Sequence, residues 1–294
     1  MPALEIKSNK VLVMDGAMGT ELIRRGLNLP LPLWSAEANL THGDLVLEIH
    51  QDYISRGADI ITTNTFRTST WSYRKAGFTV RRARERARDS LERAVDIAFK
   101  AAAGKIVAGS VTSLEDCYKP RLFPGKSAAE DSYGETTEWF QSAGIKLILF
   151  ETMGHQEEVN AALEAAASLD LTCWLSLLLK DEEHIFSGAL LTDILSSLNK
   201  KNLEMLLFNC STIKITALAI PALVKYWKKP WGVYPNLGKT EVSGDGSSIA
   251  VIDEFTFRQA ALDYLKHRPA VLGTCCGSSP FHVGLLRKLV DKQL

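Results

Sequence analysis

The feature that most constrains the fold is a regular alternation of short apolar runs with segments of helical spacing. Eight apolar runs of strand type are each followed by a helical segment along the 294 residues. The runs are residues 10–17, 58–65, 105–112, 146–152, 172–178, 204–210, 231–236 and 270–274. Continuous apolar strands are typical of parallel sheets that are covered on both faces. Eight such units predict an α/β protein with a single (β/α)8 TIM barrel, a fold of about 250 residues.

The units follow one another without a linker or a low-complexity tract, so we expect one barrel over residues 1–294. A doubly wound open sheet is the alternative. It is disfavoured because no glycine-rich dinucleotide loop follows any of the runs. The segment Asp15-Gly16-Ala17-Met18-Gly19 does not match the G-x-G-x-x-G pattern of such loops.

The charge balance excludes several classes of partner. Lys+Arg 34 equals Asp+Glu 34, so nothing attracts nucleic acid or an anionic membrane surface. The arginine-rich segment 81–88 is interpreted as the solvated face of a helix, because Ala83, Ala87 and Leu91 recur on its other face. No run is long enough to span a bilayer and residues 1–7 lack a signal region. We therefore expect a cytoplasmic protein, in which five cysteines do not form a disulfide framework.

Three of the five cysteines lie at the carboxyl ends of predicted strands. Cys210 ends the run 204–210, and Cys275 and Cys276 follow the run 270–274. These two strands flank the same neighbour in a barrel, and active sites occupy this end of the fold. Three converging thiolates predict a zinc site with one open coordination position, which can bind and deprotonate a substrate thiol. A structural zinc, or three buried cysteines without metal, is the alternative. Cys117 and Cys173 are given no role.

Several motifs resemble those of homocysteine S-methyltransferases, in the same order and nearly end to end. They are Asp15-Gly16-Ala17-Met18-Gly19-Thr20-Glu21-Leu22, Leu33-Trp34-Ser35-Ala36, Phe150-Glu151-Thr152, Asn209-Cys210, Val233-Tyr234-Pro235-Asn236, and Cys275-Cys276-Gly277 with Pro280. The chain is most similar to the stand-alone branch that uses S-methylmethionine or S-adenosylmethionine. The resemblance implies a zinc-dependent barrel in which the homocysteine thiolate attacks a sulfonium methyl group and gives methionine.

The resemblance also implies roles for individual residues. Cys210, Cys275 and Cys276 would bind Zn²⁺, and Asp15 and Glu151 would hold the ammonium group of homocysteine. Backbone N–H groups around Gly16 and Ala17 are candidates for the substrate carboxylate. Asp15 has the alternative role of a helix N-cap.

Three further positions carry expectations about the substrates. The face of Trp34 attracts a sulfonium cation, or the side chain closes the barrel mouth. Asn64 and Asn236 are predicted polar contacts at strand ends. Thr274 stands where the family usually has glycine, and it would be strained if its backbone needs a positive φ.

Other functions stay open at this point. The methyl donor could be betaine or a methylfolate–corrinoid system on a partner protein, and the acceptor another thiol or a selenol. A non-catalytic zinc-binding barrel is the alternative of a different class, and Thr274 favours it. The expected partners are homocysteine and a small sulfonium donor, without nucleic acid or membrane.

Overall fold

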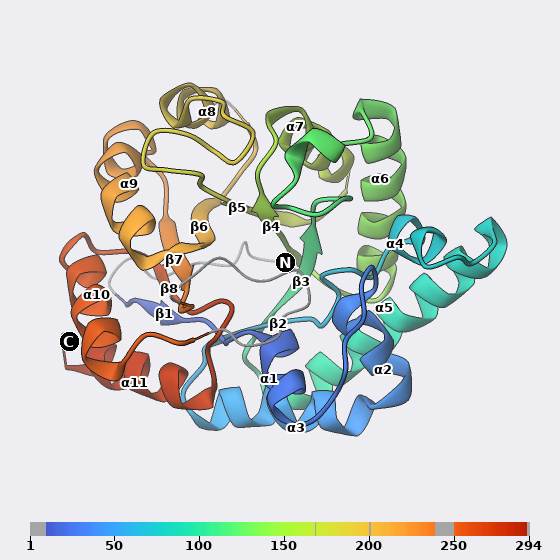
Figure 1. Ribbon diagram of the computed structural model, residues 1–294, viewed down its shortest axis with the longest axis horizontal. Coiled ribbons are helices and arrows are strands. Elements are labelled where there is room, and N and C mark those ends of the chain that lie inside the picture. Colours follow the sequence, from blue (N-terminus) through green and yellow to red (C-terminus); the bar gives the residue numbers. More distant parts are fainter. Residues whose placement is uncertain (1–9, 168, 200, 239–249, 293–294) are drawn as a thin grey trace.

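Eight parallel strands form a closed barrel in the computed structural model, which describes residues 10–167, 169–199, 201–238 and 250–292 (Figure 1). The strands are β1 (Leu12–Val13), β2 (Ile60–Thr62), β3 (Ile106–Thr112), β4 (Leu147–Met153), β5 (Thr172–Leu177), β6 (Met205–Thr212), β7 (Trp231–Asn236) and β8 (Val271–Leu272). They pair in the order β1-β8-β7-β6-β5-β4-β3-β2. A parallel bridge between Met14 and Ile60 joins the two ends of this order. The predicted (β/α)8 barrel is confirmed. Residues 1–9, 168, 200, 239–249 and 293–294 of the expected domain lie outside the described part.

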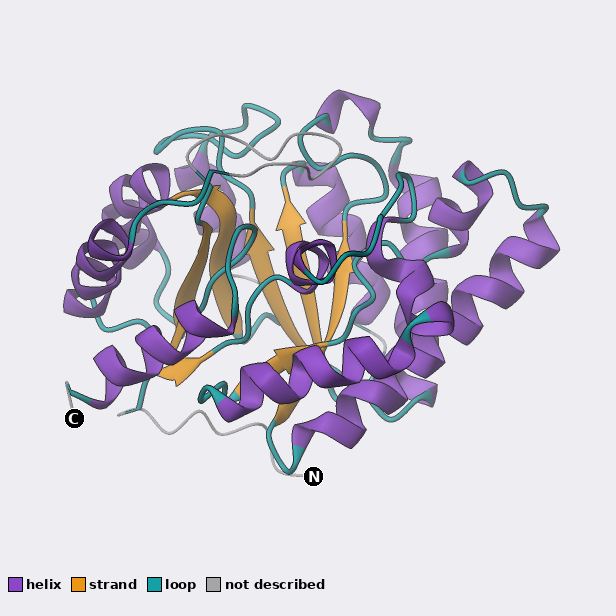
Figure 2. Cartoon of the chain, turned by 60° about the horizontal axis from the view of Figure 1, so that its bottom comes forward, coloured by secondary structure: helices purple, strands orange, loops and turns teal. Residues whose placement is uncertain are grey.

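Helices surround the strands in an outer ring (Figure 2). They are α1 (Met18–Arg24), α2 (Ala38–Thr41), α3 (Gly43–Ser55), α4 (Thr70–Lys75), α5 (Val80–Ala102), α6 (Lys126–Ser142), α7 (Gln156–Ala166), α8 (Leu191–Leu198), α9 (Ile213–Tyr226), α10 (Glu254–Lys266) and α11 (Pro280–Asp291), with two 3₁₀ helices, η1 (Trp34–Glu37) and η2 (Pro120–Leu122). The sequence does not predict η1, α2 and α4, because such short helices show no periodicity. Within the described residues, no helix is long and apolar enough to cross a membrane.

The arginine-rich start of α5 is a solvated helix face, as predicted. Ala83, Ala87 and Leu91 are fully buried. Arg81, Arg84 and other arginines of this segment are exposed or half-buried, and several form ion pairs with nearby glutamates. The helix therefore uses its apolar stripe to pack on the barrel.

Side-chain alternation along each strand decides what reaches the barrel interior. On β4, Leu147 and Leu149 belong to the interior cluster, whereas Ile148 and Phe150 pack in the outer layer against the helices. The same alternation directs Glu151 inward at the carboxyl end of the strand. On β7 it directs Tyr234 into the interior cluster. The apolar floor of the barrel thus ends in a ring of polar side chains.

Two strands, β4 and β6, lose their regular register at this ring. The pairing of β4 shifts between Phe150 and Met153, and that of β6 shifts between Asn209 and Thr212. Within each irregular segment one residue has a positive φ, Thr152 at 60° and Cys210 at 55°. Irregularities of this kind re-aim side chains next to active sites. The irregular segment of β4 directly follows Phe150 and includes Glu151, and that of β6 includes Cys210.

Candidate metal and substrate site

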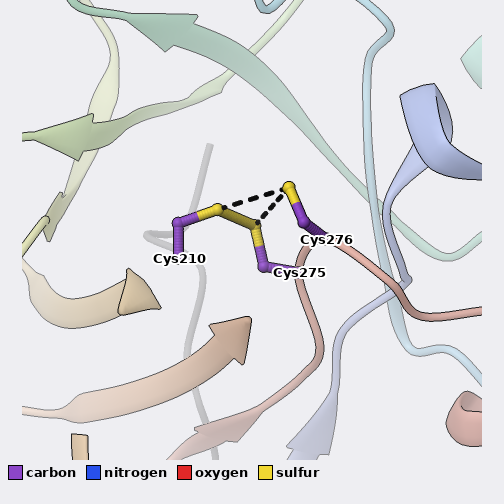
Figure 3. A group of neighbouring side chains, drawn as sticks. All are labelled: Cys210, Cys275 and Cys276. Carbon is purple, nitrogen blue, oxygen red and sulfur yellow. Dashed lines mark hydrogen bonds between the residues drawn. A yellow bond between two sulfur atoms is a disulfide. The ribbon is translucent and has the colours of Figure 1, made fainter. Parts of the chain in front are cut away.

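The three predicted cysteines meet at one point, although they come from two strand ends (Figure 3). Their Sγ atoms all lie within 4.8 Å of one another. Cys276 Sγ is 3.7 Å from Cys210 Sγ and 4.0 Å from Cys275 Sγ. Cys210 and Cys275 are joined as a disulfide, with their Cα atoms 5.6 Å apart. The expected convergence is present, whereas the expectation that the thiols are all free is not met.

The donor set fits a thiophilic metal ion such as zinc, which is bound by cysteine thiolates in tetrahedral sites. A disulfide and a metal site both require sulfur atoms in close approach, but only reduced, deprotonated thiols bind the metal. Burial raises the pKa of the Cys276 thiol to about 12, and the negative charge of Glu151 adds to this effect. A bound cation would offset that penalty, because coordination deprotonates a thiol.

Two buried carboxylates lie on the wall of the same cavity, on β4 and just after β1. Glu151 is 9% exposed, and it accepts hydrogen bonds from the hydroxyls of Ser110 and Tyr234, the latter at 3.2 Å. Asp15 is 4% exposed and accepts the Thr62 N–H at 2.8 Å. The N-cap of α1 is Ala17, so the alternative role of Asp15 as its N-cap is wrong. Both acids face the cavity without a cationic partner among the described residues.

Burial without a neighbouring cation raises the pKa of both acids. Burial raises the pKa of Glu151 to about 7, although the hydrogen bonds from Ser110 and Tyr234 act in the opposite direction. Burial also raises the pKa of Asp15 well above its usual range, and the charge of Glu151 adds to it. A paired set of unneutralised buried carboxylates is suited to receive a cation, such as an ammonium group.

Trp34 closes one side of this cavity. Its backbone has a positive φ of 51°, and its indole packs on Gly19, where an added Cβ would lie 2.2 Å from Trp34 Nε1. The cavity has a volume of about 110 Å³ and is lined by all the residues just described. A second cavity of about 450 Å³ shares only Trp34 with it, and that cavity contains neither cysteine nor the carboxylate pair. The chemistry therefore belongs to the smaller cavity.

Asn64 lines the cavity but uses its amide on the protein. Its Oδ1 accepts the Ser35 hydroxyl at 2.6 Å, and its Nδ2 donates to the Ser35 carbonyl at 3.0 Å and to Asn39 Oδ1 at 2.8 Å. Asn39 in turn donates to Ser90 on α5 at 3.0 Å. Asn64 thus holds Ser35, the residue after Trp34, through both the hydroxyl and the carbonyl group of Ser35. A substrate contact for Asn64 stays a prediction, and positioning of the Trp34 loop is the role that its contacts support.

The remaining expectations fare differently. Asn236 does not line the cavity, and its Oδ1 accepts the N–H of Gly238 at 2.7 Å, so its contact with substrate stays a prediction. The Ala17 N–H already donates to Ser278 Oγ at 3.0 Å, which leaves Gly16 as the candidate for a carboxylate. Thr274 is not among the residues with positive φ, so its backbone does not have the strain that a left-handed conformation would cause.

Five residues have contacts at the site for which the sequence predicts no role. Thr62, Ser110 and Tyr234 hold the carboxylates, and Asn209 lies between the carboxylates and the thiols. Their positions at strand ends were a usable signal. Cys117 lies in the same apolar cluster as Cys210, Cys275 and Cys276. Nothing in the sequence indicates that proximity, because it depends on the path of the long loop after β3.

The fold and this cavity define a barrel enzyme that gathers three cysteine sulfur atoms and two carboxylates at the carboxyl ends of its strands. A family profile described as Homocysteine S-methyltransferase matches residues 12–290. The chain is 29% identical to the homocysteine S-methyltransferase of Escherichia coli, over 94% of each chain. It is 27% identical to homocysteine S-methyltransferase 2 of Zea mays, over 96% of this chain and 90% of the relative.

A solved structure agrees with these sequence matches. The metallated form of the homocysteine methyltransferase MmuM from Escherichia coli superposes with a TM-score of 0.82 at 26% identity, over 96% of each chain. The chain belongs to the homocysteine S-methyltransferase family and is a methyltransferase.

Proposed function

We propose that this enzyme transfers a methyl group from a sulfonium donor, S-methylmethionine or S-adenosylmethionine, to the thiolate of homocysteine, and so forms methionine. The observation that carries the proposal is the placement of three cysteine sulfur atoms, which are three thiols when reduced, and two unneutralised carboxylates on one small cavity. An amino acid that ends in a thiol has the two groups which these side chains complement.

The chain's own residues position the acceptor. Glu151 and Asp15 attract the ammonium group, and their hydrogen bonds from Ser110, Tyr234 and Thr62 fix the carboxylates in the wall. Cys210, Cys275 and Cys276 would hold Zn²⁺, which when bound supplies a Lewis acid that keeps the substrate thiol deprotonated near neutral pH. Because the cavity is small, about 110 Å³, its lining residues hold the acceptor in a restricted position.

The donor is expected against Trp34. An aromatic face attracts a sulfonium cation by about 0.5–2 kcal/mol, and the indole is held by Gly19 and by the anchored Ser35 loop. Transfer then needs only that the methyl group face the acceptor sulfur, so orientation supplies much of the rate.

The test is zinc content together with methionine formation by the reduced protein, with S-methylmethionine, S-adenosylmethionine and betaine as separate donors. We expect one zinc per chain and turnover with a sulfonium donor. Cys210→Ser, Cys275→Ser and Cys276→Ser should each lose zinc and activity. Cys173→Ser changes a buried cysteine of β5 outside the cluster and is the matched control. A site variant that kept both zinc and turnover would refute the proposed site, and turnover with betaine alone would reassign the donor.

A further inference from the structure

Asn209 lies between the sulfur cluster (Cys210, Cys275 and Cys276) and the β4 end that carries Glu151. It is fully buried, on β6, and directly precedes Cys210. Its Oδ1 accepts the Ser176 hydroxyl at 2.7 Å and the Thr152 N–H at 2.9 Å. Its Nδ2 donates to Thr152 Oγ1 at 2.9 Å and to Cys275 Sγ at 4.0 Å. Two acceptor and two donor contacts use the full hydrogen-bonding capacity of an amide.

These contacts fix which way the amide points. The Thr152 N–H can only donate, so the amide oxygen must face β4 there. The amide nitrogen is then directed to Thr152 Oγ1 and to the sulfur of Cys275. An aspartate or a hydrophobic residue of the same size cannot make this set of contacts.

The amide bridges the two irregular strand ends. Thr152 follows Glu151 directly and has a positive φ, as does Cys210, which follows Asn209. A non-glycine residue persists in that conformation only when its surroundings hold it there. Asn209 supplies two of the hydrogen bonds that hold Thr152. The backbone after the carboxylate and the strand with the first cysteine are therefore locked to one another.

A second route links Asn209 to the same carboxylate. Ser176, which donates to Asn209, is also a polar neighbour of the Tyr234 hydroxyl. Tyr234 donates to Glu151 Oε2 at 3.2 Å. Because each hydroxyl has one hydrogen, which Ser176 gives to Asn209 and Tyr234 gives to Glu151, the two hydroxyls are polar neighbours, and buried polar groups extend from the sulfur of Cys275 to the carboxylate of Glu151.

We propose that Asn209 is a positioning residue of the methyl-transfer site, which sets the separation between the sulfur cluster and the Glu151 carboxylate and hydrogen bonds the Cys275 sulfur. The inference rests on the proposed function for the identity of the substrate. It gives the asparagine of the Asn209-Cys210 pair a role of its own beside that of the cysteine. Loss of the amide should weaken metal binding and acceptor binding together, and leave donor binding unchanged.

The experiment compares three variants of the reduced, full-length protein. Asn209→Ala removes the whole set of contacts, and Ser176→Ala removes one hydrogen bond to the amide and a polar neighbour of the Tyr234 hydroxyl. Asn199→Ala is the matched control, because the Asn199 amide, at the end of α8, also donates two hydrogen bonds, to the carbonyls of Leu195 and of Tyr226 in α9. The readouts are zinc affinity by competition with a chromophoric chelator, the thiolate-to-metal absorption band of the Co²⁺-loaded protein, and KM for each substrate.

We expect Asn209→Ala to lower zinc affinity by about 10–100-fold, shift the cobalt band and raise KM for homocysteine by about tenfold, with KM for the donor unchanged. Ser176→Ala should show the same pattern at a smaller size. Asn199→Ala should lower thermal stability alone. The inference is overturned if Asn209→Ala matches Asn199→Ala in zinc affinity, cobalt band and KM for homocysteine. If Asn209→Ala does not fold, wild-type values for Ser176→Ala overturn it.

The same data separate this inference from the proposed function. A wild-type protein that binds zinc but forms no methionine contradicts the proposed function, while the zinc affinities and cobalt bands of the variants still decide the role of Asn209. A wild-type protein without zinc or cobalt affinity overturns both.

Discussion

At the scale of single residues, the site is built from groups that would be unfavourable anywhere else. Glu151 and Asp15 are buried acids without a counter-ion among the described residues, and Trp34, Thr152 and Cys210 have left-handed backbones. Each feature costs stability and is retained where a ligand is to be held. Substitutions at these positions are therefore expected to affect ligand binding and the free energy of unfolding differently.

Glu151→Gln is expected to stabilise the metal-free protein and to weaken homocysteine binding. The pKa of Glu151 is about 7 in the folded state, above its ordinary value of 4.5, so the unfolded chain releases this proton more readily. The penalty for ionisation is therefore absent below about pH 4.5, grows through pH 7 and is complete above it. At pH 8 the variant should gain about 2–3 kcal/mol in the free energy of unfolding, with no gain at pH 4.5. Chemical denaturation at the two pH values measures this.

The same group predicts how acceptor binding depends on pH. Below pH 7, Glu151 carries a proton that must leave before the carboxylate can pair with an ammonium group. The value of kcat/KM for homocysteine should therefore rise by up to about tenfold per pH unit as pH approaches 7, and flatten above it. Glu151→Gln should lose this inflection and lower kcat/KM by about 10–100-fold. An unchanged inflection in the variant would assign it to another group.

Gly19→Ala tests the placement of Trp34. The new methyl group would lie 2.2 Å from Trp34 Nε1, so the indole must move. We expect KM for the sulfonium donor to rise by about tenfold, the scale of one cation–π contact, with KM for homocysteine unchanged. Gly134→Ala is the control, because a Cβ there meets no atom within 4 Å and the residue lies in α6. Equal effects on both Michaelis constants would mean that Trp34 does not face the donor alone.

At the scale of elements, short helices and loops that carry no sequence periodicity hold the site. Ser90 on α5 accepts from Asn39 at 3.0 Å and donates to the Ala36 carbonyl at 2.7 Å, so it ties η1 and α2 to a long helix. Ser90→Ala should lower the free energy of unfolding by about 1–3 kcal/mol and raise KM for the donor. Ser196→Ala removes an exposed serine contact on α8 and should change neither. Thermal melts and donor titrations compare the two.

The sequence predicts the parts of the site that follow from strand order and alternation. Cys210, Cys275, Cys276 and Glu151 lie at strand ends, and a closed barrel brings such ends together. Asn64 shows the limit of this reasoning, because its partners Ser35 and Asn39 belong to η1 and α2, which are too short to predict. The nearness of Cys117 to the thiols depends on a loop, whose path is set by tertiary contacts and not by local pattern.

At the scale of the whole molecule, the residues that stabilise the fold and those that form the site lie at opposite ends of the barrel. Asp59 precedes β2 at the amino end, where it accepts from Val13 N–H at 3.0 Å and pairs with Lys105 and with Arg287 of α11. It therefore joins the first strand, the residue that precedes the third strand, and the last helix. Residues at this end of a barrel serve stability, whereas those at the carboxyl end serve catalysis.

Asp59→Ala should consequently lower the melting temperature and leave catalysis intact. Removal of the acid leaves the buried Val13 N–H without a partner and takes one of the two carboxylates from Arg287, which keeps Asp291, at a cost of about 1–3 kcal/mol. The Michaelis constants and kcat, measured below the melting transition, should match those of the wild type. Altered Michaelis constants would show that the two ends of the barrel are mechanically coupled.

The locked distance between the sulfur cluster and the carboxylate has a consequence for substrate choice. If Asn209 holds Glu151 and Cys275 at one separation, the cavity selects an amino acid whose ammonium and thiol groups are that far apart. Cysteine has the same two end groups as homocysteine but one methylene fewer between them, so it can satisfy only one end at a time. A fixed separation would then disfavour methylation of cysteine, because one buried amide sets the distance between the two groups that hold the substrate.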